Sequence, residues 1–223
     1  MALSWLDRAE LLLYGAAFVC GIVSAAALAV AQGEFEGHCI LYGEVSYNTT
    51  ENAFSFSTFS SFSLCYFISV ISILIALYCF CILLYWVYVS CIDEVTRGSL
   101  WLNISMVISV VILFFLLVCA CILRVGMNIL CDSITKTKKV QRCPEAETLR
   151  WVSPYDGSRF YTNLYSAEAA AWVNLFFWVL VLLLLSVQKK VSGSRPAPFQ
   201  PLSGSDPEWT TSETDAIIGP YKP

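Results

Sequence analysis

Ten cysteines are the residues of this sequence whose types and spacing best suit chemistry. Four of them lie in or beside two polar connections between apolar segments: Cys39, Cys65, Cys131 and Cys143. Thiols in loops too short to bury a core are typical of a disulfide framework formed in an oxidising compartment. Four cysteines allow three pairings. The simplest one pairs cysteines within each connection, Cys39 with Cys65 and Cys131 with Cys143.

The remaining reactive groups suggest little further chemistry. Cys91 directly follows an apolar segment, so it is a candidate for S-palmitoylation, with an unmodified thiol as the equal alternative. The only histidine, His38, stands next to Cys39, and no group of His, Asp or Glu has metal-ligand spacing. The sequence therefore predicts no catalytic residues, no cofactor and no metal site.

The connection from about Gln32 to Cys65 has the composition of an exterior loop. It contains four glutamates, no lysine or arginine, and the glycosylation sequon NTT at Asn48. The positive-inside count does not decide the orientation, because seven basic residues fall on the side of the cysteines and six on the other. The cysteines favour an exterior location for their own side, which places both termini in the cytoplasm.

The elements that position these residues are four uncharged apolar runs, in a chain that is 57% hydrophobic and 13% charged. The runs cover about 11–31, 66–90, 101–123 and 169–187, each long enough to cross a bilayer as a helix. They predict an all-α membrane protein, a four-transmembrane-helix bundle with small disulfide-tied extracellular loops, over residues 1–190. One alternative is a signal peptide cleaved after Ala31, which would leave three spans. The run of 21 residues is longer than a usual signal core.

Small residues predict how the bundle packs, because helices in lipid associate where backbones approach closely. Ala17, Gly21, Ala25 and Ala29 form a row at four-residue spacing, which favours a central position for the first span. The fourth span is bulky throughout, and we expect it to face lipid over most of its surface. The segments HCILYGEVSY and FSFSTFSSFS nearly alternate apolar and polar residues, which suggests short strands, with serine-rich loops as the alternative.

Two functional classes are disfavoured by the distribution of polar residues. Asn174 and Gln188 are placed at span ends, so we expect no ionisable or strongly polar group inside the bundle, as a pore or pump would need. The net charge of −4 is spread along the chain without a basic stripe. Nucleic acid is therefore not an expected partner.

The last part of the chain, residues 191–223, is rich in Pro, Gly, Ser and acids and is predicted to be a disordered cytoplasmic tail. Glu213, Ile217 and Ile218 have the spacing of an acidic dileucine sorting signal, although the first aliphatic residue of such signals is normally leucine. Such a signal would make clathrin adaptors partners of the tail. Acids lie three residues after each of three phosphorylation candidates, Ser205, Thr210 and Ser212.

Taken together, several segments resemble the transmembrane protein 179 family in order and spacing: ALSWLDRAELLLYGAAFVCG, QGEFEGHCILYG, LCYF, ACILRVG, WVNL and DPEWTTSETDAI. The resemblance covers nearly the whole chain. It implies a four-span membrane protein of a family without an established biochemical activity. The sequence lacks the adjacent CCG cysteines of tetraspanins and the GLW-centred loop motif of claudins, so the functions of those families are not carried over.

These observations predict a multi-pass tetraspan protein without enzymatic activity. We expect it to act by lateral association or trafficking in secretory, endosomal or plasma membranes. Its expected partners are membrane lipids, other membrane proteins and, through the tail, clathrin adaptors. The alternative is a lipid-binding or lipid-transporting bundle, or an auxiliary channel subunit.

Overall fold

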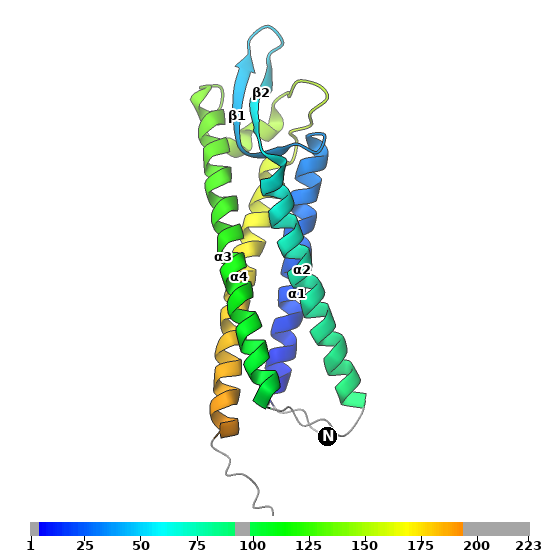
Figure 1. Ribbon diagram of the computed structural model, residues 1–223. Helices are drawn as coiled ribbons and strands as arrows, with labels where there is room; N and C mark the ends of the chain where they lie inside the picture. Colours follow the sequence, from blue (N-terminus) through cyan, green and yellow to red (C-terminus); the bar gives the residue numbers. More distant parts are fainter. Residues whose placement is uncertain (1–4, 92–98, 194–223) are drawn as a thin grey trace, which may run out of the picture.

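The computed structural model describes residues 5–91 and 99–193, which form four long helices and a small outer layer (Figure 1). The helices are α1 (Trp5–Glu34), α2 (Phe62–Cys91), α3 (Ser99–Lys136) and α4 (Phe160–Gly193). All four are long and apolar enough to cross a membrane, which confirms the prediction of a four-span helical membrane protein. Each helix is longer than the apolar run that predicted it.

On each helix a seam of buried residues alternates between spacings of three and four, with further buried residues such as Ala25 beside it. On α1 the seam residues are Glu10, Tyr14, Ala17, Gly21, Ser24, Leu28 and Ala31. On α4 they are Leu164, Ala167, Ala171, Asn174, Trp178, Val181 and Leu185. The same spacing holds on α2 from Cys65 to Trp86 and on α3 from Leu102 to Leu123. A seam that repeats every 3.5 residues is typical of left-handed helix packing, in which side chains of one helix fit between those of the next.

Helix α1 packs against both α2 and α4, and α4 packs in turn against α3, whereas α2 and α3 contact each other little. Gly21 lies where α1 meets α2: a Cβ atom added there would stand 3.1 Å from the Ser72 carbonyl oxygen and 3.2 Å from the Ala76 Cβ. The predicted central position of the first span is therefore confirmed. Cleavage of α1 as a signal peptide would remove the helix that joins α2 to α4.

The predicted row of small residues on α1 is only partly correct. Ala17, Gly21 and Ala25 are buried, but Ala29 is exposed. A step of four residues turns about 40° beyond a full helical turn, so a strict row of four moves off the seam after three steps. Leu28 and Ala31 take the inner positions instead.

Helix α4 contributes more to the core than its bulky sequence predicted. It begins at Phe160, well before residue 169, and these first turns bury Phe160, Leu164 and Ala167. Within its membrane window 28% of the residues are buried, against 33% in the windows of the other three helices, so α4 faces outward only slightly more than they do.

The outer layer stands on the end of the bundle opposite the N-terminus (Figure 1). Strands β1 (Cys39–Asn48) and β2 (Ala53–Ser60) pair as an antiparallel hairpin, with Val45 opposite Phe56. The two segments suggested as strands are therefore mainly strands, although the second one ends at Ser60 and its last residues begin α2. The hairpin leans on α3, which continues outward past Leu123 to Lys136.

A third segment completes the outer layer. The 3-10 helix η1 (Cys143–Thr148) is followed by a loop whose Trp151 pairs with Phe54 in a parallel bridge. The Phe54 N–H donates to the Arg150 carbonyl oxygen at 2.9 Å, and the Val152 N–H donates to the Phe54 carbonyl oxygen at 2.9 Å. Beneath this bridge Phe35, at the end of α1, packs edge-to-face on Trp151, so one aromatic core joins the hairpin, the loop and the bundle.

Candidate functional site in the outer layer and the bundle interior

The hairpin is fixed to α3 by close backbone packing. Gly126 of α3 faces the start of β1, and a Cβ atom there would lie 2.7 Å from Leu41 Cδ2 and 2.8 Å from Tyr42 Cε2. About two turns further along the same side of α3, the Val45 N–H donates to Ser133 Oγ at 2.8 Å. Glycine at 126 and serine at 133 therefore let a strand lie directly against a helix.

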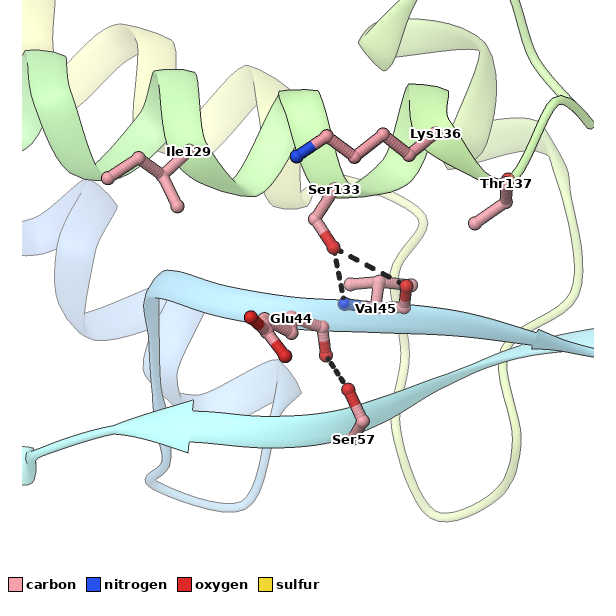
Figure 2. Close-up of a pocket in the computed structure, with 7 residues that line it drawn as sticks. All are labelled: Glu44, Val45, Ser57, Ile129, Ser133, Lys136 and Thr137. Atoms are coloured by element: carbon pink, nitrogen blue, oxygen red, sulfur yellow. Dashed lines mark hydrogen bonds between the residues drawn. The ribbon is translucent and has the colours of Figure 1, made fainter.

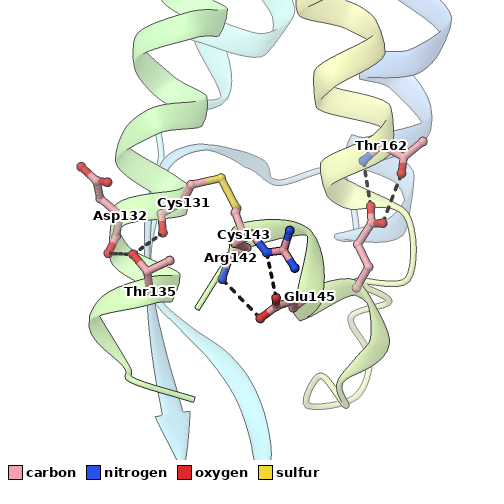
Figure 3. Close-up of a disulfide and its surroundings, with 8 residues drawn as sticks. Cys131, Asp132, Thr135, Arg142, Cys143, Glu145 and Thr162 are labelled. Carbon is pink, nitrogen blue, oxygen red and sulfur yellow. Dashed lines mark hydrogen bonds and ion pairs between the residues drawn. A yellow bond between two sulfur atoms is a disulfide. The ribbon is translucent and has the colours of Figure 1, made fainter. Parts of the chain in front are cut away.

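Two disulfides lock this arrangement. Cys39–Cys65 joins the start of β1 to the first turns of α2, and Cys131–Cys143 joins the outer end of α3 to η1 (Figure 3). The sequence predicted this arrangement, with one disulfide within each connection, as the simplest pairing. Cys79 and Cys119, two of the thiols inside the spans, are buried packing residues in the helices.

Polar contacts near the disulfide Cys131–Cys143 brace η1 and join it to α4 (Figure 3). Arg142 Nε donates to Glu145 Oε1 at 3.1 Å, and the backbone N–H groups of Gln141 and Arg142 donate to Glu145 Oε2. These backbone hydrogen bonds, with the nearby guanidinium, lower the pKa of Glu145 from its usual value. Glu147 in turn accepts the Thr162 N–H at 2.7 Å, at the beginning of α4.

A pocket of about 320 Å³ lies between the hairpin and α3 (Figure 2). Its lining residues are Glu44, Val45, Ser57, Ile129, Ser133, Lys136 and Thr137. Figure 2 shows Glu44 on the strand side and Lys136 on the helix side of this space. Both side chains are exposed, so the pocket offers one carboxylate, one ammonium group and several hydroxyls to a polar group from outside.

The bundle interior contains polar groups that sequence reasoning placed elsewhere. Asn174 is 1% exposed and lies one turn before Trp178, whose ring packs edge-to-face on Tyr14. The expectation that Asn174 lies at a span end was therefore wrong. Its place in the 3.5-residue repeat with Ala167 and Ala171 is the signal that could have revealed it.

Charged residues occur near both ends of the bundle. Near the outer end, Arg124 Nη1 pairs with Glu168 Oε1 at 3.1 Å, and the Glu168 side chain is 7% exposed. At the other end Gln188 Nε2 donates to Glu10 Oε2 at 3.0 Å, and Glu10 is buried. Both carboxylates thus lie between helices, where a neutralising or hydrogen-bonding group is needed. Among the residues that the structure describes, no group of three or more His, Cys, Asp or Glu could hold a metal ion.

The remaining predicted sites are placed only in part. Asn48 is the last residue of β1, at the turn of the hairpin, and its Oδ1 accepts the Thr50 N–H at 2.9 Å. Cys91 is the last residue of α2. The sorting and phosphorylation candidates lie outside the described residues: Ser205, Thr210, Ser212, Glu213, Ile217 and Ile218. Helix α4 continues to Gly193, three residues into the predicted tail.

Comparison with known proteins identifies the family. Residues 6–218 match the family described as the transmembrane protein 179/179B claudin domain. Homo sapiens transmembrane protein 179B is 48% identical over 98% of this chain and 97% of its own length. The Danio rerio protein of the same name is 46% identical, over 94% of this chain and 93% of its own length. The Mus musculus protein of that name is 44% identical, over 100% of this chain and 99% of its own length.

No solved structure matches the chain. The matched domain is described as a claudin domain, so the missing GLW-centred motif does not separate this chain from that type of domain. The identity extends from the first helix into the tail and covers nearly the full length of each relative. The chain therefore belongs to the transmembrane protein 179/179B family.

Proposed function

We propose that this multi-pass membrane protein acts without catalysis, by binding other membrane proteins laterally and by presenting its outer layer to them. One observation carries the proposal: two disulfides and the Val45–Ser133 contact hold the hairpin, α3 and η1 as one unit. A surface fixed before binding loses less conformational freedom when a partner docks, and so binds more tightly. The non-enzymatic part of the proposal rests on the sequence, which has a single histidine.

The polar pocket is the part of this surface that we assign to partner recognition. Glu44 and Lys136 stand on its two sides, so a partner group that carries both charges, or a pair of opposite charges, matches it. Neither residue packs in the core, because both are exposed. Substitution of these residues therefore changes recognition without changing the fold.

The proposed orientation places the outer layer outside and both termini in the cytoplasm. All four disulfide cysteines lie at the end of the bundle opposite the N-terminus, and disulfides form in oxidising compartments (Figure 1). Asn48, at the turn of the hairpin, is proposed to carry a glycan. An Asn48→Gln variant that migrates like the glycosidase-treated wild type supports this orientation. A wild-type chain whose migration glycosidase leaves unchanged counts against it.

The tail is proposed to direct trafficking among secretory, endosomal and plasma membranes. Glu213, Ile217 and Ile218 supply the adaptor signal, and phosphorylation at the three candidate hydroxyls adds negative charge before the isoleucine pair. Palmitoylation of Cys91 would anchor the end of α2 to the membrane surface on the same side as the tail.

Affinity purification in mild detergent tests both halves of the proposal. We would compare the wild type with an Ile217→Ala, Ile218→Ala variant and with a Glu44→Ala, Lys136→Ala variant. The tail variant is expected to lose adaptor subunits and keep its membrane partner, while the pocket variant is expected to do the reverse. A Glu51→Ala, Arg150→Ala variant, which removes two exposed charges outside the pocket lining, serves as the control. A wild-type chain that recovers no specific membrane protein at native abundance contradicts the proposed function.

A further inference from the structure

An apolar groove lies between the first turns of α1 and the last turns of α4, in the half of the bundle away from the outer layer. It has a volume of about 420 Å³, and its lining residues are Ala9, Leu12, Leu13, Leu180, Leu183, Leu184 and Val187. Leu12 and Leu183 are 73% and 57% exposed, so they form its outer rim and face the hydrocarbon of the membrane. Every lining side chain is aliphatic. The groove therefore accepts hydrocarbon and offers it no hydrogen bond.

Cations stand at the end of this groove. Arg8 is one turn before Leu12 on α1, and Lys190 is one turn after Val187 on α4, so both share the groove's side of their helices. Trp5, on the same side of α1, is 77% exposed, as an aromatic residue at the lipid headgroups would be. The acids nearby are Asp7 and Glu10, and Glu10 is turned into the bundle, where Gln188 Nε2 donates to its carboxylate.

The size of the groove limits what can occupy it. Leu180 to Val187 rise about 10 Å along α4, so a volume of about 420 Å³ gives a mean cross-section of roughly 40 Å². A transmembrane helix with a diameter of about 10 Å needs roughly 80 Å². A helix of another protein or of a second copy of this chain would therefore rest on the rim of the groove and not fill it. An extended acyl chain is much narrower.

We propose that this groove is a binding site for an anionic phospholipid of the leaflet next to the termini. One acyl chain lies between α1 and α4, and the headgroup phosphate lies between Arg8 and Lys190. Cationic groups at the end of an interhelical pocket on the cytoplasmic side match anionic headgroups. The choice of lipid rests on the proposed orientation of the function above, because anionic lipids are concentrated in the cytoplasmic leaflet.

The test measures which lipids remain bound to the purified full chain. The protein is extracted in mild detergent from vesicles that contain equal amounts of phosphatidylserine and phosphatidylcholine, and retained lipids are counted by native mass spectrometry. The wild type is expected to retain phosphatidylserine preferentially. An Arg8→Gln, Lys190→Gln variant is expected to lose that preference by about 25-fold, since each cation near the surface contributes about fivefold. Leu183→Trp, which fills the groove from its exposed rim, is expected to release both lipids.

Matched controls separate a site from general surface charge. Lys189→Gln removes the same charge one residue away on a different side of α4, and Leu77→Trp adds the same bulk at an exposed position of α2. Both controls are expected to retain lipid like the wild type. Equal retention of the two phospholipids by the wild type, or an effect of Lys189→Gln equal to that of a single Lys190→Gln variant made beside it, overturns the proposal. The test uses detergent-extracted protein. Its outcome therefore does not depend on partner binding or on the result of the glycosylation test of orientation.

Discussion

Ser133 of α3 satisfies both backbone groups of Val45 in β1. The Val45 N–H donates to Ser133 Oγ at 2.8 Å, and the Ser133 hydroxyl lies 3.4 Å from the Val45 carbonyl oxygen, to which it donates. Val45 is 7% exposed, so water does not readily replace these contacts. One side chain thus connects the sheet of the outer layer to a helix of the bundle (Figure 2).

Removing this hydroxyl is expected to loosen the outer layer. In a Ser133→Ala variant the Val45 N–H loses its partner, which costs about 1–3 kcal/mol of unfolding free energy. We expect a lower thermal midpoint in detergent and faster hydrogen exchange at Val45. Ser57→Ala is the control, because Ser57 Oγ donates to the Glu44 carbonyl oxygen at an exposed position, where water can take over. Equal loss of stability in both variants would contradict the role given to Ser133.

Gly21 is expected to tolerate no larger side chain, because α2 lies against it. Gly21→Leu forces α1 away from Ser72 and Ala76, and overpacking of this kind costs about 1–3 kcal/mol. Gly15 has no atom within 4 Å of the Cβ position, so Gly15→Leu gains helix propensity without a clash. Thermal unfolding of the two variants in one detergent checks this. Loss of stability in the Gly15 variant equal to that in the Gly21 variant would show that α1 and α2 do not meet at Gly21.

The two disulfides are expected to contribute unequally to stability. Chain-entropy estimates give about 3.5 kcal/mol for Cys39–Cys65, with a separation of 26 residues, and about 2.8 kcal/mol for Cys131–Cys143, with 12. Double Cys→Ser variants of each pair, compared by denaturant unfolding, test the order. The opposite order would mean that α3 and η1 depend on their disulfide for more than loop closure.

Glu145 gives a pH dependence whose direction follows from its hydrogen bonds. Its pKa in the folded protein is below the usual 4.5, because the Gln141 and Arg142 N–H groups and the Arg142 guanidinium favour the carboxylate. The stabilisation of η1 is therefore complete above pH 4.5 and is lost as pH falls through the lower folded value. Carboxyl NMR titration is expected to give a midpoint below 4.5 for the wild type and a midpoint closer to 4.5 in an Arg142→Gln variant. A wild-type midpoint above 4.5 contradicts this.

The sequence predicted the four spans and favoured the observed disulfide pairing, and it suggested two short strands with loops as the alternative, without pairing those strands. Hydropathy gave the spans because none of the runs contains a charge, but it ended the third span at Leu123. Arg124 and the later lysines made the outer part of α3 resemble a loop. The spacing of Leu123, Met127, Leu130 and Ile134, all buried, carries the helix onward. Periodicity would have predicted the long α3 where hydropathy could not.

Which face of each helix is buried, and where the candidate sites lie, could be learned only from the structure. In lipid, outward residues such as Leu12 and Leu183 are as apolar as inward ones, so hydrophobicity does not distinguish the two sides of a span. Small and polar residues at a spacing of three or four do mark the inner side of a span, as the buried Ser105 and Ser109 show on α3. The groove and the pocket each join segments distant in sequence, α1 with α4 and β1 with α3. The tertiary fold decides which of these segments meet, and no local sequence pattern predicts it.

Asn174 supplies the last prediction, an increase in stability. Its Oδ1 is buried without a hydrogen-bond partner in the described part of the chain, and such an atom costs about 1–3 kcal/mol. Asn174→Leu has a similar shape and removes the unpaired oxygen, so we expect a higher thermal midpoint.

Asn163→Leu is the matched control for this substitution, because Asn163 Nδ2 donates to the Glu34 carboxylate at 3.4 Å and its loss should lower stability. Replacement of these two asparagines of α4 by leucine is thus expected to shift the thermal midpoint in opposite directions. A lower midpoint for Asn174→Leu would mean that the amide binds a buried water or fixes the register of α1 against α4, as a polar residue in a 3.5-residue seam can. Amide hydrogen exchange along α4 would then separate these two roles, since a shift of register changes protection on both helices.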